Sequence, residues 1–594
     1  MIARVMGVVV AAWCVVSSAS AQAPSAAPDS AHVRRDAERA QERFERIRIQ
    51  ELPWVWDGGS SGSCDERVGR FCLTFDDADD EPWTPPPETE RVQEARDTLL
   101  ARLRDAAARV RGDWWISGQL VRYLVEDGRV DEARDAARRC SAERWWCLAL
   151  ETFALHAGER FAEAEPVYDS ALALMPAQVH DAWSDLSLLL PREARREFQH
   201  LHGAERDRIT RRFWWLADPL YLVPGNERRT EHASRLVMNR LQERAWSPER
   251  TRWGDDLKEL LLRYGWPSGW QHVRRSGAYA LDRSGSITRY GDAWAFLPPL
   301  DDARHPERIS EDGWRLDSTS ARTGYAPPYV ERFDSVAYQV ALFRRGDSVL
   351  VIGVLALPRD DAATVRFASG SPGARRRVSG WRTGEPVQAA LFIRGDSGDA
   401  MVSVRDSVDR PRAVLRARVA PVPSVVSLEA FSAAGRQAVR VRFALDASRV
   451  AGPGVALSDV LLLDDVPPGG VSPTLDDVLP LARAGTLVHA GERIALYWEL
   501  YRDREQPAPV SVEVSVWEAR AGFGRRLARA LHLAGAPYRT QLEWDERSGA
   551  GPVWRRALAL QLGQLREGSY IVRVRARLPD GRVVERSREL QVRE

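Results

Sequence analysis

The chain has 594 residues, with 85 basic against 84 acidic side chains and a formal net charge of +1. This balance excludes a global attraction to nucleic acid or to anionic membranes. Almost all the basic residues are arginines interleaved with acids, as in residues 502–505, which is typical of a solvated surface. At about 150 residues per domain, the length is enough for three or four domains.

The first residues have the features of a secretory signal peptide. Arg4 is followed by an apolar run from Val5 to Val16, shorter than the ~20 residues of a membrane-spanning helix. Ala19-Ser20-Ala21 has the small-x-small pattern of a signal-peptidase site. We therefore expect residues 1–21 to be removed and the mature chain to be periplasmic, envelope-bound or secreted, without a membrane span. A retained N-terminal anchor is the alternative.

Four cysteines remain after this cleavage, namely Cys64, Cys72, Cys140 and Cys147. An even number in an exported chain indicates disulfides, and short spacing favours Cys64–Cys72 and Cys140–Cys147 among the three possible pairings. Zinc is the weaker alternative, because neither pair has Cys-x-x-Cys spacing and an oxidising compartment disfavours free thiolates. Four buried thiols are a further alternative. The sequence predicts no metal and no cofactor.

Residues 22–91 are expected to form a linker or tether with a disulfide loop, including an exposed helix up to about Ile49. Two patterns inside it match functional motifs. Gly58-x-Ser60-x-Gly62 has the form of a nucleophile elbow but lacks the strand and helix that should flank it. The acidic run 76–81 lacks the spacing of a calcium loop, which favours a solvated loop over a weak Ca²⁺ site.

From residue 92 to 203 apolar residues recur at helical intervals of three and four. Two stretches about 31 residues apart are alike: one starts at Trp114-Trp115 and the other at Trp145-Trp146. The second continues with Ala164, Tyr168, Ala171 and Pro176, and resembles the tetratricopeptide repeat. This resemblance implies paired helices that offer a concave surface to peptides. A Cys140–Cys147 bond would staple the turn between the two units.

Two motifs occur between residues 204 and 300. One is Phe213-Trp214-Trp215-Leu216-Ala217-Asp218-Pro219, and the other runs from Trp253-Gly254-Asp255-Asp256 to Tyr264-Gly265-Trp266-Pro267. They resemble the motifs of the GWxTD-domain family, whose members are mostly exported and whose biochemical role is unknown. The resemblance implies an architecture and supplies no catalytic residues. The residues that carry it are Phe213, Trp214, Asp218, Pro219, Trp253, Asp256, Tyr264, Gly265 and Pro267.

The same stretch has a physical interpretation of its own. Asp218 precedes proline, so a helix should end there. Residues 231–244 are expected to form an amphipathic helix with Leu236 and Leu241 on its apolar side. Asp255 or Asp256 is expected to cap a helix over 257–262.

After about residue 277 the apolar period changes to two. Residues 336–343 and 349–354 are predicted as strands joined by the turn Arg345-Gly346-Asp347-Ser348, and residues 390–404 repeat the pattern. Gly-Asp suits a hairpin turn, which disfavours an integrin-binding loop or a serine nucleophile at these turns. We predict a β-sandwich over 301–475 and an immunoglobulin-like sandwich over 476–594.

The fold class is therefore multidomain α + β, with N-terminal helical repeats, a mixed central segment and C-terminal antiparallel β-sandwich domains. The favoured function is a non-catalytic binding or scaffold protein of the cell envelope, with a protein or peptide partner bound by the helical repeats. The alternative is a hydrolase of envelope glycans or peptides that brings together Asp218, Glu231 and Asp256. Carboxylates ~5–9.5 Å apart in a cleft would indicate glycoside chemistry.

Overall fold

A computed structural model gives the fold. It describes residues 30–57, 66–73, 85–249, 251–275, 286–289, 297–310, 327–330, 332–334, 336–357, 381, 386–395, 401–467, 472–502, 508–519, 538–549, 551–563 and 565–593. The predicted signal peptide, the Gly58–Gly62 pattern, Cys64 and the acidic run 76–81 lie outside these residues.

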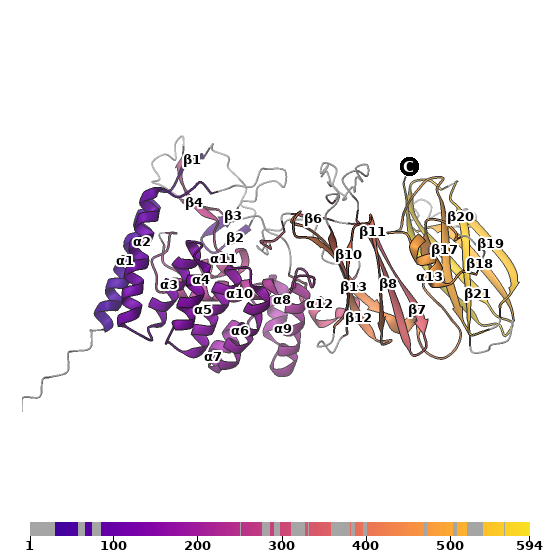
Figure 1. Ribbon diagram of the computed structural model, residues 1–594, viewed down its shortest axis with the longest axis horizontal. Coiled ribbons are helices and arrows are strands. Elements are labelled where there is room, and N and C mark those ends of the chain that lie inside the picture. Colours follow the sequence, from indigo (N-terminus) through magenta and orange to yellow (C-terminus); the bar gives the residue numbers. More distant parts are fainter. Residues whose placement is uncertain are drawn as a thin grey trace, which may run out of the picture.

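The N-terminal part is helical and the C-terminal part consists of β-sheets, arranged one after the other along the long axis (Figure 1). This confirms the mixed α and β class. The helices are α1 Ser30–Gln50, α2 Glu90–Arg109, α3 Trp114–Glu126, α4 Val130–Arg139, α5 Arg144–Ala157, α6 Phe161–Leu174, α7 Ala177–Trp183, α8 Arg192–Gln199, α9 Gly203–Ala217, α10 Glu227–Gln242 and α11 Asp255–Tyr264. A small sheet of β1 Trp54–Asp57, β4 Gly269–Arg275 and β5 Ser286–Arg289 and a hairpin of β2 Glu66–Val68 and β3 Phe71–Leu73 accompany them.

Helix α1 is packed, so the expectation of an exposed helix or tether is wrong for residues 30–50. Val33, Ala37 and Phe44 lie on one face of α1 and are buried in the helical core, where α1 packs on α2. Their spacing of four and seven residues is the apolar stripe of a core-facing helix. The segment also contains many charged residues, two of which, Glu45 and Arg48, are themselves buried, and this high charge concealed the stripe in the sequence.

Two helix hairpins, α3–α4 and α5–α6, turn in the same way. Arg129 N donates to Leu124 O at 2.8 Å in the first turn, and Arg160 N donates to Leu155 O at 2.9 Å in the second. Gly128 has φ +72° and the residue 31 positions later, Glu159, has φ +56°. The left-handed position of the second turn is therefore filled by Glu159 rather than by the neighbouring Gly158, and the two turns keep the spacing of 31 residues.

Helix α10 lies across α3, α5 and α6, and most of its 16 residues are buried. Leu236 and Leu241 face the helical core, as predicted. A Cβ on Gly118 of α3 would come within 2.4 Å of Leu241 Cδ2, so glycine permits the two helices to approach closely. The helix begins at Glu227, four residues before the predicted start.

The first β unit has two sheets that share one core. The sheet order is β10-β9-β12-β13-β6 in one and β11-β8-β7 in the other, with every neighbouring pair antiparallel except β13 and β6. Leu355, Leu391 and Leu428 belong to this core together with Phe213 of α9. The strands are β6 Arg332–Asp334, β7 Tyr338–Arg345, β8 Ser348–Ala356, β9 Val387–Gly395, β10 Met401–Val408, β11 Arg412–Val419, β12 Pro423–Ser432 and β13 Gln437–Asp446.

The second β unit also has two sheets. One contains β14, β17, β15 and β20, and the other has the order β16-β22-β21-β18-β19. Trp498, Val512 and Val574 lie in their common core. The strands are β14 Ala456–Leu457, β15 Leu461–Leu463, β16 Leu487–His489, β17 Arg493–Tyr501, β18 Pro509–Glu518, β19 Tyr538–Arg547, β20 Val553–Gln561, β21 Gly568–Arg577 and β22 Val583–Arg593, with the short helix α13 Leu475–Val478 before β16.

Several local predictions are confirmed. Strands β7 and β8 pair through a turn in which Gly346 has φ +66°, and β9 pairs with β10. Helix α9 ends at Ala217, directly before Asp218-Pro219. Within the described residues, the helices are all too short or too polar to cross a bilayer.

Candidate functional site

The turn between α4 and α5 carries a disulfide. Cys140 and Cys147 are bonded, with 5.6 Å between their Cα atoms. The predicted pairing of these two cysteines is confirmed, and it links the end of one helix hairpin to the start of the next. The other predicted pairing involves Cys64, outside the described residues, and Cys72, whose side chain is not described.

The Asp218-Pro219 motif is held by arginines of the first β unit. Helix α9 ends at this motif, and its last carbonyl groups lack partners within the helix. Arg442 of β13 donates to the carbonyl oxygens of Leu216 at 2.7 Å and Asp218 at 2.9 Å, and Arg440 donates to those of Asp218 and Pro219 at 3.0 and 3.1 Å. Guanidinium groups therefore terminate α9 and attach it to the sheet.

A buried carboxylate completes this junction. Glu429 of β12 is fully buried and forms an ion pair with Arg442 at 3.0 Å. It also accepts hydrogen bonds from Leu222 N at 3.0 Å and from Ser427 Oγ at 2.7 Å. Hydrogen bonds in which the donor or the acceptor is ionised are the strong ones, and those from Leu222 N to Glu429 and from Arg442 to Leu216 O join segments more than 200 residues apart in sequence.

Two more carboxyl groups lie at the same junction without such partners. Both carboxyl oxygens of Glu227 and Oδ1 of Asp218 are buried and make no hydrogen bond in the described structure. Burial, with Asp218 nearby, raises the pKa of Glu227 well above its usual value. Burial also raises the pKa of Asp218, against the opposing effect of Arg442. An unpartnered carboxyl group in such a site is held neutral rather than ionised.

The second motif anchors the β2–β3 hairpin to α11. Arg70 of the hairpin turn contacts both carboxylate oxygens of Asp256, at 2.5 and 2.9 Å, and Tyr264 donates to Glu66 at 2.6 Å. The hydrogen bond from Arg70 lowers the pKa of Asp256 to about 2. The N-cap of α11 is Gly254, so the prediction that Asp255 or Asp256 caps this helix is wrong: both lie in its first turn. There they complement the helix dipole.

The other motif residues are structural neighbours of these groups. Trp253 Nε1 donates to Asn239 of α10 at 3.0 Å. Gly265 has φ +84°, and a Cβ at this position would lie 3.0 Å from Nη2 of Arg235. Phe213 and Trp214 are buried, with Trp214 tilted against the ring of His232. The motif thus brings α10, α11 and the β2–β3 hairpin together.

A threonine, a histidine and a glutamate form a chain of contacts inside the helical part. His156 of α5 lies 2.8 Å from Glu231 through Nε2 and 2.9 Å from the hydroxyl of Thr230 through Nδ1, both on α10. The order resembles a nucleophile, base and acid. Thr230 is fully buried and donates to the carbonyl of Glu227, so no substrate reaches its hydroxyl. The contacts tie α10 to α5.

The structure places the three carboxyl groups of the hydrolase alternative in separate clusters. Asp218 faces β13, Glu231 faces His156 and Arg235, and Asp256 faces Arg70. Arg235 and His156, acting against burial, hold the pKa of Glu231 well below its usual range. Among the described residues, His, Cys, Asp and Glu form no group of three that could hold a metal ion.

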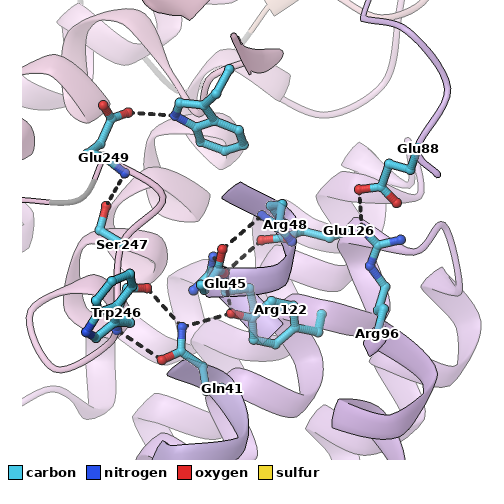
Figure 2. A network of polar contacts seen from close by, with 12 residues as sticks. Gln41, Glu45, Arg48, Glu88, Arg96, Arg122, Glu126, Trp246, Ser247 and Glu249 are labelled. Atoms are coloured by element: carbon cyan, nitrogen blue, oxygen red, sulfur yellow. Dashed lines mark hydrogen bonds and ion pairs between the residues drawn. The ribbon is translucent and has the colours of Figure 1, made fainter. Parts of the chain in front are cut away.

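A second buried network, which the sequence did not indicate, joins α1 to α3 (Figure 2). Arg48 of α1 pairs with Glu126 of α3 at 2.5 Å, and Arg122 pairs with Glu126 at 2.7 Å and with Glu45 at 3.3 Å. Burial favours the neutral acid, but Arg122 and Arg48 lower the pKa of Glu126 to about 2. Gln41 extends the network to the backbone of Trp246.

The two β units are also joined by a buried carboxylate that is paired with an arginine. Glu499 of β17 is fully buried and binds both terminal nitrogens of Arg345, at 2.6 and 3.1 Å. Asp459 accepts a hydrogen bond from Leu342 N at 3.0 Å, and Arg588 of β22 donates to Val340 O at 2.7 Å. Side chains of the second unit thus satisfy the free edge of β7.

Comparisons with known proteins assign the chain to no family. Neither a protein-family model nor a curated protein matches the chain. Parts of it match red sea bream transglutaminase (9% identity, 55% of this chain and 41% of that chain, TM-score 0.14) and Bacteroides uniformis β-glucuronidase (9%, 41% and 26%, 0.16). A tetra-tandem repeat from the extending region of a large adhesion protein also matches (14%, 44% and 50%, 0.13). The chain spans at most half of each, and at these TM-scores the likenesses carry no argument.

Proposed function

We propose that this chain is an exported, non-catalytic binding or scaffold protein of the cell envelope. The observation that carries the proposal is how its parts are joined. Arg442 with Glu429 links the helical part to the first β unit, and Arg345 with Glu499 links the two β units. Buried, charge-assisted bonds fix geometry more firmly than a linker does. Such a molecule holds its surfaces at fixed separations, as a scaffold must.

The finer assignments belong to the same proposal. The repeated turn, with Gly128 and Glu159 in equivalent positions, supports a degenerate tetratricopeptide-like repeat in α3–α6. The shared cores of the paired sheets support a β-sandwich followed by an immunoglobulin-like sandwich. The contacts of Asp218, Asp256 and Tyr264 supply a structural reason for a GWxTD-like motif. The Cys140–Cys147 bond supports an oxidising compartment.

A protein partner would bind the outer face of the helix hairpins. Repeats of this kind usually bind peptides on the inner face, but here α10 lies across α3, α5 and α6. The outer face, on α4 and α6, is polar with one large exposed apolar side chain, Leu174, at 54% exposure. Leu174 is therefore the residue whose replacement tests the docking face.

The experiment compares three baits made from residues 22–594: the unchanged chain, Leu174→Glu and Val583→Glu. Val583 is the matched control, 46% exposed on β22. Each is immobilised and exposed to cell-envelope extract of the native host. We expect a partner retained by the unchanged chain and the control and lost by Leu174→Glu. A partner that all three baits retain would contradict the assignment of the outer face as the docking surface. If no bait retains a specific partner, the proposed scaffold function is contradicted.

Export is tested separately by fractionation and N-terminal sequencing. We expect the protein outside the cytoplasm, with a mature chain that begins at or near Gln22. An intact Met1 in the cytoplasm would exclude the proposed compartment.

A further inference from the structure

A cleft of about 770 Å³ lies between the two β units. It is lined by the start of β7, the turn that joins β10 to β11, and the segment that leads into β16. Its volume lies within the range of small-molecule sites, roughly 300–1,000 Å³. None of the motif residues of the helical part lines it.

Contacts between the two units hold the residues around the cleft in place. Gly485 has φ +100°, and a Cβ at this position would lie 2.7 Å from the Cβ of Ala337, so the two units meet there through a glycine. Gln339 of β7 donates to the carbonyl oxygens of Leu462 and Arg483, which fixes the neighbouring segment. The cleft is therefore formed by the same contacts that join the units.

Two of the arginines that line the cleft are already neutralised. Arg412 pairs with Asp464 at 2.5 Å, and Arg483 pairs with Glu492 at 2.6 Å. Arg410, in the β10–β11 turn, is exposed and has no ion pair or hydrogen bond within the described part of the chain. The same holds for the carboxylate of Asp406. The cleft thus offers one free guanidinium group and one free carboxylate.

The rest of the lining determines the kind of ligand. Its apolar residues are small or aliphatic, and the lining contains no phenylalanine, tyrosine or tryptophan. The alanine, valine and leucine residues of the lining are Val336, Ala337, Ala356, Val408, Ala413, Val414, Ala484 and Leu487. Such walls suit small aliphatic side chains. A guanidinium group recognises a carboxylate through paired hydrogen bonds, and the carboxylate of Asp406 accepts N–H groups.

We propose that this cleft binds a short, alanine-rich peptide with a free C-terminal carboxylate, which Arg410 recognises, while Asp406 accepts from the peptide nitrogens. A free short-chain acid shares the carboxylate but has no N–H for Asp406. The site deepens the proposed binding function by naming a second ligand class. It is independent of the helical docking face, so Leu174→Glu should still bind the peptide.

The test is calorimetric titration of the mature chain with three probes: trialanine, trialanine amide and butyrate. We expect trialanine to bind. Trialanine amide and butyrate each lack one charge-assisted contact, so their dissociation constants should be at least about tenfold higher. The substitution Arg410→Ala should weaken the binding of trialanine by a similar factor. Arg418→Ala, an exposed arginine on β11 outside the cleft, is the matched control and should leave binding unchanged.

Three results would overturn the proposal. They are no binding of trialanine to the unchanged chain, equal binding of butyrate and trialanine, and equal binding by the Arg410→Ala and Arg418→Ala variants. Failure here leaves the envelope-capture result untouched, because Arg410 lies away from the helical part.

Discussion

Arg442 stacks on the ring of Tyr221, with 3.9 Å between its guanidinium carbon and the ring centroid. Tyr221 lies two residues after Pro219, and Arg442 is in the middle of β13. The planar guanidinium group therefore meets a ring on one face and, in its own plane, the carboxylate of Glu429 and two carbonyl oxygens. Only arginine has enough donors in a rigid fork to satisfy all of these groups.

Replacement of Arg442 should weaken the junction strongly. Arg442→Ala leaves the carboxylate of Glu429 buried without its counter-ion, which typically costs about 3–5 kcal/mol. Arg442→Lys should recover only part of this loss, because an ammonium group cannot reach the carboxylate and both carbonyl groups. Urea unfolding followed by tryptophan fluorescence measures the change. Arg418→Ala, on the surface of β11, should stay within about 0.5 kcal/mol of the unchanged protein; a fully stable Arg442→Lys would contradict the assignment.

Glu227 should make the protein less stable as the pH rises. Its pKa in the folded state lies well above the value of about 4.3 in an unfolded chain. Between these two pKa values the folded state binds more protons, so the stability that Glu227 contributes is present below the unfolded pKa and is lost as the pH rises toward the folded pKa. Asp218 acts in the same direction.

The variant Glu227→Gln cannot ionise and tests this directly. At pH 8 it should exceed the unchanged protein in unfolding free energy by at least about 1 kcal/mol, the equivalent of roughly one pKa unit, and the gain should disappear near pH 4.5. Denaturant titrations at a series of pH values give the comparison. Glu94→Gln, on the exposed side of α2, is the control and should leave the pH dependence of the unfolding free energy unchanged. A gain that does not depend on pH would show that Glu227 is ionised in the folded state.

Much of the fold follows from local patterns in the sequence. The period of 3.6 predicted α3–α6, the period of two predicted the β7–β8 hairpin, and proline after Asp218 predicted the end of α9. These signals depend on residues within a turn or two of each other, so one chain segment contains them. The cysteine spacing predicted the Cys140–Cys147 bond for the same reason.

The junctions could not be predicted in this way. The contact of Arg442 with Leu216 spans 226 positions and that of Arg345 with Glu499 spans 154. In sequence these arginines look like the solvated charges around them, and only burial distinguishes them. Helix α10 was predicted as amphipathic, but its polar side is also buried, because its side chains meet a histidine of α5, a glutamate of α6 and a backbone carbonyl of α11.

Arg240 of α10 occupies a cage of tryptophan rings. Its guanidinium carbon lies 4.8, 4.7 and 5.0 Å from the ring centroids of Trp114, Trp145 and Trp146. Cation–π contacts contribute about 0.5–1 kcal/mol at exposed sites and about 2 kcal/mol or more when desolvated, and the Arg240 side chain, at 27% exposure, lies between these cases. Arg240→Ala should therefore destabilise the packing of α10 by about 1–3 kcal/mol, and Arg240→Lys by less. Denaturant unfolding measures both, and millimolar guanidinium ion should restore part of the Arg240→Ala loss. Equal stability of the alanine variant would show that the rings alone hold α10.

The Cys140–Cys147 bond should contribute a moderate, measurable stability. It closes a loop with a sequence separation of 7, for which the chain-entropy relation gives about 2.5 kcal/mol at 25 °C. The double variant Cys140→Ser/Cys147→Ser should lose about this amount in urea unfolding, and addition of reductant to the unchanged protein should reproduce the loss. Reductant should have no effect on the α4–α5 region of the double variant. This control distinguishes the effect of the Cys140–Cys147 bond from the effect of reducing any other disulfide.

Hydrogen exchange in α4 and the first turn of α5 should rise in the double variant, since the bond holds the end of one helix to the start of the next. Unchanged unfolding and exchange would mean that the helix packing alone fixes the turn.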